Sequence, residues 1–239
     1  MLGELTFFLG LQVYQTNKGI FISQTKYIKD MLKKFKMEDS KPVGTPMVTG
    51  CKLSKDDESL EVDHTMFRSM IGSLLYVIAT RPNVMQVVGL VAWFQSTLKE
   101  PHVTSVKRIF KYLKGTMEYG LWYPKGQYFT LKAFIDADWV GSVDDQKSNS
   151  GAAFFLGNCL VSWSSKKQSS ISLSTVEAEY IVVTSCCAQF IWMKQTLKYV
   201  QVECNQPISM FFYNTNIINI SKFCVMRSKT KHIPIKYIL

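Results

Sequence analysis

The first fifty residues alternate between short apolar runs and polar breaks, a pattern that predicts a β-hairpin followed by a helix. Two runs rich in β-branched and aromatic residues, Leu5 to Tyr14 and Ile20 to Ser23, flank the polar sequence TNKG at 16–19. Asn and Gly tolerate the backbone conformations of tight turns, so we expect the chain to reverse there. Apolar residues then recur at helical spacing from Ile28 to Phe35, and we expect Thr25 to cap this helix.

The middle of the chain has the apolar periodicity of helices. The segment from Met66 to Ala79 is apolar on most faces, Arg81-Pro82 interrupts it, and a second apolar segment runs from Val84 to Leu98. A third segment, His102 to Leu113, has apolar residues on one face and basic residues on another. The charged stretch that precedes these helices, Lys52 to Asp63, is expected to be an exposed loop.

From about residue 128 the pattern changes to the two-residue period of strands, and it predicts an α/β fold with a mixed sheet. A long helix is expected to start at Ser174, because Glu177 follows three residues later as in a capping box. This helix is apolar on nearly all sides, as is typical of a helix buried in the middle of a domain. The expected elements, in chain order, are strands at 129–136, 152–156 and 160–164, a helix at 174–197, a strand at 209–213 and a helix at 214–222.

Composition and charge narrow the class of protein. A chain of 239 residues with 47% hydrophobic and 19% charged residues is typical of a globular protein with one large domain or two small ones. The formal net charge of +10 favours an anionic partner such as nucleic acid. After Glu203 the chain has basic residues but no acidic one, and this tail could lie along phosphates or simply be solvated.

Cysteine and hydropathy patterns bear on the cellular location. The six cysteines include no C-x-x-C pair and no His at ligand spacing, so we do not expect a zinc site. Adjacent Cys186 and Cys187 in a helical pattern suit the reduced interior of an intracellular protein. No stretch approaches the ~18 apolar residues of a membrane span, and the N-terminus is a poor signal peptide. We expect a soluble intracellular protein with no membrane partner.

Two carboxylates from different elements are candidates for metal chemistry. Asp136 lies at the end of the first expected strand, where the other interpretation is a turn residue beside Asp138. Glu179 lies in the first turns of the long helix, and its helical neighbours Val182 and Cys186 are apolar. A carboxylate in such surroundings is neutral, paired or bound to a cation. Mg²⁺ prefers such oxygen ligands, and a pair of ions can activate water to cleave a phosphodiester.

Longer motifs make the sequence recognisable. DADW at 136–139, SWSSKKQ at 162–168, SLSTVEAEY at 172–180 and SKTKHI at 228–233 resemble the ribonuclease H domain of copia-type retrotransposon Pol polyproteins. LTFFLGL at 5–11, RSMIGSLLY at 68–76 and KRIFKYLKG at 107–115 resemble the end of the reverse transcriptase and the segment that joins it to the nuclease. The resemblance covers essentially the whole chain, with its motifs in the family's order.

The resemblance implies both an architecture and an activity. Residues 1–50 would be the C-terminal part of a reverse transcriptase, 51–127 a helical connection region, and 128–239 a ribonuclease H-like domain whose fifth strand is missing. In that family the nuclease uses four carboxylates and Mg²⁺ to cleave the RNA strand of an RNA–DNA hybrid. The paired catalytic aspartates of the polymerase lie upstream of the matching segment, so the resemblance implies no polymerase activity.

Matched residue by residue, the nuclease site is incomplete. Asp136 corresponds to the first carboxylate and Glu179 to the second, and these two would be the catalytic and metal-binding residues. The third position belongs to an Asp, but Tyr213 occupies it, and a phenol with a pKa near ~10 is a poor Mg²⁺ ligand at pH 7. For the fourth position, the acidic residue that usually follows Lys-His-Ile is Pro234 here, and the other candidate position lies beyond the last residue.

Three hypotheses follow, and the leading one is a catalytically inactive remnant with an open sheet edge, which would lower solubility or require a partner. The alternative is a non-catalytic module that binds RNA–DNA hybrids through backbone and 2′-OH contacts. Its candidate residues also have an ordinary interpretation as helix caps and solvated side chains. A third hypothesis, a working nuclease that takes its missing ligands from another chain, has no support in the sequence. The candidate nucleic-acid-binding residues are Lys166, Lys167, Ser174 and Thr175.

Overall fold

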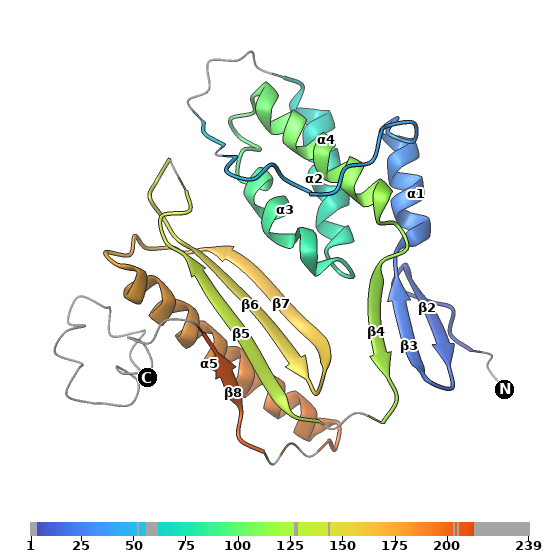
Figure 1. The fold of residues 1–239 in the computed structure, drawn as a ribbon, viewed down its shortest axis with the longest axis vertical. Coiled ribbons are helices and arrows are strands. Elements are labelled where there is room, and N and C mark those ends of the chain that lie inside the picture. The colour runs from blue at the N-terminus through green and yellow to red at the C-terminus, as the bar shows by residue number, and fades with distance from the viewer. Residues whose placement is uncertain are drawn as a thin grey trace. The chain divides into compact units, whose positions relative to one another are not determined.

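The computed structural model describes residues 4–51, 53–55, 62–126, 129–142, 144–202, 204 and 206–212. The chain divides into two compact units, unit 1 at Met1–Gly126 and unit 2 at Gln127–Leu239. Each unit has its own four-stranded sheet and its own hydrophobic core within the described residues (Figure 1). This mixture of helices and strands confirms the predicted α/β class.

The sheet of unit 1 is antiparallel and takes its last strand from the end of the unit. Its strands lie in the order β1 (Phe7–Phe8), β2 (Leu11–Thr16), β3 (Gly19–Ser23) and β4 (Gly120–Pro124). The hairpin between β2 and β3 is confirmed, but the run expected at 5–14 is two strands rather than one. Leu9 and Gly10 form the break, with positive φ angles of 49° and 81°. The Tyr76 hydroxyl donates to the Leu9 carbonyl at 2.7 Å and would collide with a Cβ at Gly10, so the turn requires glycine there.

Four α-helices lie in the described part of unit 1 and share one core. Ile28, Leu74, Val88 and Phe110, one from each helix, have no exposed surface. The break expected at Arg81-Pro82 is confirmed, but the following helix ends at Ala92 rather than Leu98, and turns replace its last residues. The helices are α1 (Thr25–Lys34), α2 (His64–Val77), α3 (Met85–Ala92) and α4 (Glu100–Gly115), and a short 3₁₀ helix, η1, spans Pro82–Val84.

The start of α1 differs from the expectation that Thr25 is its cap. Thr25 is the first helical residue, and its hydroxyl donates to the Met117 carbonyl at 3.2 Å. Gln24 stands at the cap position without a side-chain capping bond, and its amide donates to the Tyr76 carbonyl at 3.0 Å. Gln24 is fully buried. The helix start is therefore held by contacts with distant residues rather than by a local cap.

Arg81 is a buried cation that connects two helices of unit 1. Its guanidinium donates to the carbonyl of Thr116 at 2.8 Å and to the hydroxyl of Thr116 at 2.6 Å, just after α4 ends. Only 1% of the side chain is exposed, and this burial lowers the pKa of Arg81 from its ordinary value. The two short hydrogen bonds offset part of the cost of removing the charge from water.

The sheet of unit 2 is mixed. Its strand order is β7-β6-β5-β8, in which β5, β6 and β7 are antiparallel and β8 is parallel to β5. A parallel return requires a crossover, and α5 provides it. The predicted order of three strands, a helix and a strand is confirmed, whereas the helix expected at 214–222 lies outside the described residues. The elements are β5 (Leu131–Asp138), β6 (Asn149–Leu156), β7 (Cys159–Lys167), α5 (Thr175–Tyr199) and β8 (Ser209–Phe211).

One face of this sheet is covered by α5 (Figure 1). Ala133 of β5 and Phe154 of β6 are buried against Val182 and Phe190 of the helix. The expectation that α5 is buried on nearly all sides is wrong, because several of its apolar side chains face solvent. Trp192, for example, is 58% exposed.

The other face of the sheet carries aromatic side chains. Phe134 of β5 stacks on Phe211 of β8 with ring centroids 5.0 Å apart, and meets Phe155 of β6 edge to face at 5.6 Å. Phe134 and Phe211 are about half exposed. The alternation that buries Ala133 necessarily turns Phe134 outward, since successive strand residues point to opposite faces.

Candidate functional site at the start of helix α5

Three segments of unit 2 meet where α5 begins: the end of β5, the end of β7 and the loop before the helix. The indole N–H of Trp139, just after β5, donates to the Ser172 carbonyl at 3.1 Å. The Gln168 amide, just after β7, donates to the Ala178 carbonyl in the first turn of α5 at 2.8 Å. The structure therefore brings together the motifs at 136–139, 162–168 and 172–180.

Gln168 lies at the centre of this junction. Its side chain is 6% exposed, and its amide also donates to the Ser150 hydroxyl of β6 at 3.0 Å. Its carbonyl accepts from the Ser172 hydroxyl at 2.9 Å, and its backbone N–H donates to the Ser148 carbonyl at 2.8 Å. A buried amide bonded at both ends fixes the segments that it joins. The role of Gln168 is not apparent from the sequence alone, where the only signal for it is its place in the 162–168 motif.

The first turn of α5 has the predicted cap. The Ser174 hydroxyl accepts from the Glu177 N–H at 3.2 Å, which confirms Ser174 as the N-cap. The Glu177 carboxylate accepts from the Leu173 N–H at 2.7 Å, one residue earlier than in a standard capping box. Ser174 is thus used in capping, whereas the neighbouring Thr175 is exposed.

The turn that follows β5 is built around Asp138. A Cβ at Gly141 would collide with the Asp138 carboxylate and approach the Asn149 amide, so a residue with a side chain would not fit at this position of the turn. Val140, inside the turn, has a φ of 53°. Burial, and then the charge of nearby Asp136, raise the pKa of the Asp138 carboxyl above its ordinary value. The DADW motif at 136–139 therefore places the carboxylates of Asp136 and Asp138 close enough to repel each other.

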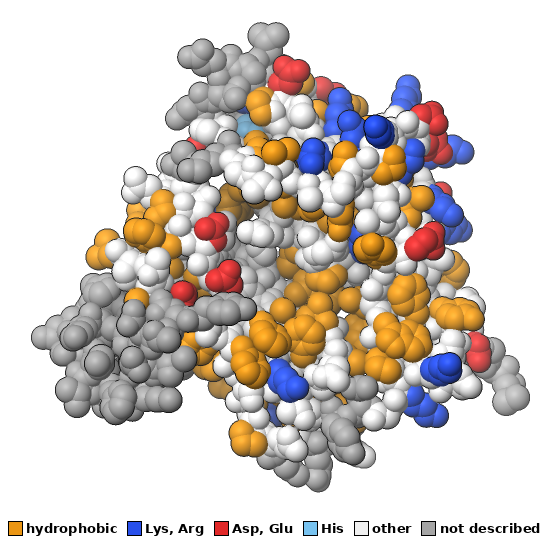
Figure 2. Space-filling model, viewed as in Figure 1, with side chains coloured by type: hydrophobic (Ala, Val, Ile, Leu, Met, Phe, Trp, Pro, Cys, Tyr) orange, Lys and Arg blue, Asp and Glu red, His pale blue; other side chains and the backbone are white. Residues whose placement is uncertain are grey.

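The two predicted catalytic carboxylates lie at this end of unit 2, on different elements. Asp136 is exposed on β5 and pairs with Gly151 of β6, whose missing side chain leaves that surface open. Glu179 lies in the second turn of α5, directly after Ala178, and is partly buried with Oε2 shielded from solvent. Acidic side chains are visible over this end of unit 2 in the space-filling view (Figure 2).

The number of carboxylates decides whether these side chains can form a metal centre. In the part of the chain that the structure describes, no three side chains of His, Cys, Asp or Glu converge to hold a metal ion. A centre that cleaves phosphodiesters with two metal ions needs enough carboxylates to bind both ions. Asp136 and Glu179 do not fit such a centre by themselves. Tyr213, which the sequence resemblance matches to the third carboxylate, lies outside the described residues.

The candidate nucleic-acid-binding lysines differ in their surroundings. Lys167 forms an ion pair with Asp145 at 2.7 Å and donates to the Ser142 hydroxyl at 2.9 Å, which holds the loop after β5. Burial opposes ionisation of Asp145, but hydrogen bonds from Lys167 and Ser142 outweigh it, and the pKa of Asp145 is lowered. Lys166 is exposed. Of the four candidates, Lys166 and Thr175 present exposed side chains, while Lys167 and Ser174 have structural partners.

Both units together define a two-part α/β protein, and comparison with known proteins places it in a family. The chain is 36% identical, over 234 residues, to the retrovirus-related Pol polyprotein from transposon RE1 of Arabidopsis thaliana. The aligned residues make up 98% of this chain and 16% of that polyprotein. It is 33% identical to the corresponding polyprotein from transposon RE2, and the aligned residues again make up 98% of this chain and 16% of that polyprotein. The chain belongs to the family of retrovirus-related Pol polyproteins of copia-type transposons.

The length of the match varies among relatives. An uncharacterized mitochondrial protein of Arabidopsis thaliana is 35% identical over 195 residues, which make up 80% of this chain and 79% of that protein. The chain spans less than a fifth of the transposon polyproteins that it matches. No family model and no solved structure matches the chain. Among the described residues, no helix is long and apolar enough to cross a membrane.

Proposed function

We propose that unit 2 is a ribonuclease H-like domain, derived from a retrotransposon Pol polyprotein, that no longer cleaves its substrate. The observation that carries this proposal is the strand order β7-β6-β5-β8. Three antiparallel strands, a crossover helix and a strand parallel to the first form the mixed α/β arrangement that the hydrophobic pattern predicted, and this arrangement supports the ribonuclease H-like fold that the resemblance implies. The convergence of the three nuclease-like motifs at the start of α5 supports the same assignment.

The loss of cleavage is proposed from the set of ligands. By the resemblance, Asp136 and Glu179 supply two carboxylates, Tyr213 stands at the third position, and Pro234 stands at one of the two candidate positions for the fourth. A phenol is neutral at pH 7, and proline has no side-chain oxygen. Two carboxylates would hold one Mg²⁺ weakly and would not organise a pair of ions for in-line displacement.

The test is cleavage of a labelled RNA–DNA hybrid with Mg²⁺ or Mn²⁺ by the full chain. The wild type and a Glu179→Gln variant are expected to cleave no faster than buffer. Cleavage by wild type that Glu179→Gln abolishes would overturn the proposal. Tyr213→Asp restores the missing carboxylate, and Tyr213→Phe is its matched control. Cleavage by the Asp variant alone would identify position 213 as the lost ligand.

A second candidate function is binding of RNA–DNA hybrids without cleavage, favoured by the exposure of Lys166 and Thr175 beside the motif junction. Fluorescence anisotropy with a hybrid and a single strand of equal length, at two salt concentrations, tests it. Lys166→Gln should weaken hybrid binding and lower the salt slope by about one. Lys194→Gln, an exposed lysine on α5, is the charge-matched control. Equal affinity for hybrid and single strand, or no effect of Lys166→Gln, would contradict this function.

A further inference from the structure

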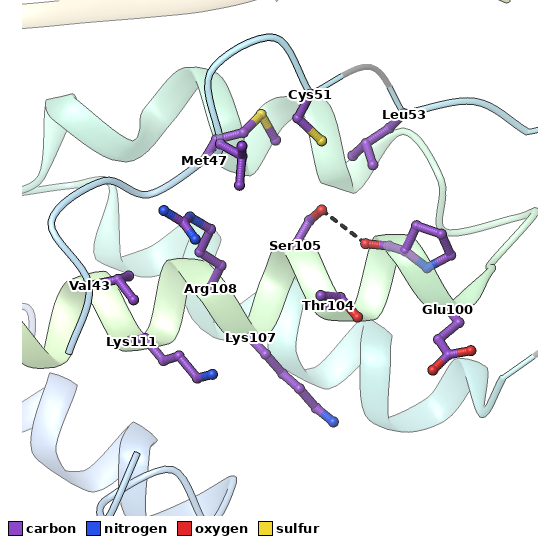
Figure 3. A pocket seen from close by; sticks show the side chains of 12 residues that line it. Val43, Met47, Cys51, Leu53, Glu100, Thr104, Ser105, Lys107, Arg108 and Lys111 are labelled. Carbon is purple, nitrogen blue, oxygen red and sulfur yellow. Dashed lines mark hydrogen bonds between the residues drawn. The ribbon is translucent and has the colours of Figure 1, made fainter. Parts of the chain in front are cut away.

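Each unit has an apolar surface feature that the nuclease assignment does not use. In unit 1 it is a pocket of about 620 Å³ beside α4, with a lining that includes Val43, Met47 and Leu53 (Figure 3). Lys107 and Lys111 also line this pocket, but Figure 3 shows them pointing away from the facing segment, so their charges do not select a ligand. In unit 2 the feature is the aromatic face of the sheet, where charge and shape are ordered.

The aromatic cluster lies on the side of the unit 2 sheet that is opposite α5 (Figure 1). Phe155 and Phe211 both contact Phe134, and none of the three belongs to the core that α5 covers. In the described part of unit 2, α5 is the only helix, so no described helix of this unit covers the cluster. Exposed apolar clusters of this kind are typical of protein interaction sites.

The charges of β5 are separated along the same face. Lys132, Phe134 and Asp136 follow one another at two-residue spacing, so their side chains share the outward face of the sheet. Ala133 and Ile135, between them, are buried on the other face. The strand therefore has a cation on one side of Phe134 and a carboxylate on the other. Such a pattern is complementary to a reversed copy of itself.

The neighbouring strand β6 varies in side-chain size in the same order. Phe155 pairs with Lys132 in the sheet, whereas Gly151 pairs with Asp136. Paired residues of antiparallel strands lie on the same face, so the large ring lies beside the cation and the position without a side chain lies beside the carboxylate. The shape of the face, like its charge, is therefore complementary to a reversed copy.

We propose that this face packs against the same face of a second copy of the chain, related by a two-fold axis that lies in the interface and crosses β5 at Phe134. Lys132 of each copy then lies opposite Asp136 of the other. Phe155 of each copy fills the space over Gly151 of the other. A two-fold axis parallel to β5 would instead place like charges opposite each other, which is unfavourable.

The area of the face predicts a weak dimer. Strands about 4.8 Å apart, with about six residues each at ~3.3 Å, give this four-stranded sheet a footprint of roughly 400 Å² per copy. The total of roughly 800 Å² is less than the ~1,200–2,000 Å² of stable complexes. We therefore expect a dissociation constant in the micromolar range, and a dimer that depends on protein concentration.

Sedimentation velocity of the full chain, from low micromolar to submillimolar concentration, measures this dimer. Wild type is expected to change from monomer to dimer as the concentration rises. Phe134→Ser removes the ring at the centre of the interface and should raise the dissociation constant about tenfold or more. Trp192→Ser removes an exposed aromatic ring from α5, outside the face, and should leave the dissociation constant unchanged.

Charge reversal tests the direction in which the two copies pack. Lys132→Asp places a like charge opposite Asp136 in both halves of the interface and should raise the dissociation constant about tenfold. Adding Asp136→Lys restores opposite charges and should bring the constant back to within about threefold of wild type. Lys194→Asp makes the same change of charge at an exposed position of α5 and should have no effect.

A steric variant tests the contact between β6 strands and does not depend on charge. A Cβ at Gly151 meets the Asp136 backbone oxygen at 3.7 Å, which is an ordinary contact, so the monomer should fold with Gly151→Leu. The added side chain occupies the space that Phe155 of the second copy would fill, and should weaken the dimer about tenfold. Circular dichroism checks the fold of each variant, and the charge and steric variants decide if Phe134→Ser is unfolded.

Three outcomes would overturn the proposal. Wild type that stays monomeric at every concentration would assign the aromatic face to a different partner. A dimer that Trp192→Ser weakens as much as Phe134→Ser would lie on another surface. A double charge variant that dimerises no better than Lys132→Asp alone, with Gly151→Leu unchanged from wild type, would refute the two-fold arrangement.

Discussion

Replacing Gln168 tests whether the motif junction is held by this one side chain. Gln168→Met keeps the length of the side chain and removes three hydrogen bonds, which join Gln168 to Ser150, Ser172 and Ala178 over 2.8–3.0 Å. At about 1 kcal/mol for each bond, and more where a buried partner is left without one, the loss is about 3 kcal/mol. A methionine returns part of this through apolar contacts, so we expect a net destabilisation of about 2–3 kcal/mol.

The assay must distinguish the two units, because a chain with two compact parts need not unfold in a single transition. Hydrogen exchange pulses across a urea gradient, read by mass spectrometry, give a midpoint for peptides of each unit. With a urea dependence of about 1–3 kcal/mol per molar, the midpoint of unit 2 should fall by about 1–2 M. Gln195→Met, at an exposed position of α5, is the matched control. A unit 2 midpoint that moves no further for Gln168→Met than for Gln195→Met would refute the reasoning.

Three other changes have defined outcomes. Gly141→Ala places a Cβ against the Asp138 carboxylate and should destabilise unit 2 by about 1–3 kcal/mol, measured by thermal unfolding. Arg81→Met leaves the Thr116 carbonyl and hydroxyl without their donor and should cost unit 1 about 2–4 kcal/mol, measured by its urea midpoint, with no change in unit 2. Burial and the charge of Asp136 raise the folded-state pKa of Asp138, so wild type should lose stability as the pH rises from the ordinary value of 3.8 through the raised pKa. Asp138→Asn should lose less over that range, and equal losses in urea titrations across the range would contradict this.

The regular alternation of apolar and polar residues made the strands of unit 2 predictable from the sequence. The two-residue period in β5 predicts which side chains are buried, and the spacing of Ser174 and Glu177 predicts the N-cap of α5. Both signals are local, since they depend on residues a few positions apart. The strand order of the sheet then follows from the direct connections between β5, β6 and β7, which are consecutive in the chain, and from the crossover through α5.

Features that depend on contacts with residues far away in the sequence could not be predicted from it. β4 is five residues long and has no independent signal, because its pairing with β3 is decided by residues at the other end of unit 1. Thr25 has the residue type of a cap, but its hydroxyl bonds to Met117 instead. Gln168 gains its role only when β6, β7 and α5 are assembled. The roles of Asp136 and Glu179 in metal binding remain predictions, as does the effect of Tyr213.

The pairing of β3 with β4 has a consequence for the order of events on the ribosome. Gly19 of β3 pairs with Pro124 of β4, so the sheet of unit 1 cannot be completed until all four helices of the unit have been synthesised. The hairpin of β2 and β3 emerges before these helices, with one edge of β3 open during that interval. Open strand edges pair readily with other chains. The nascent chain is therefore most exposed to mispairing before Gly120 leaves the exit tunnel, and translation past β4 ends that period.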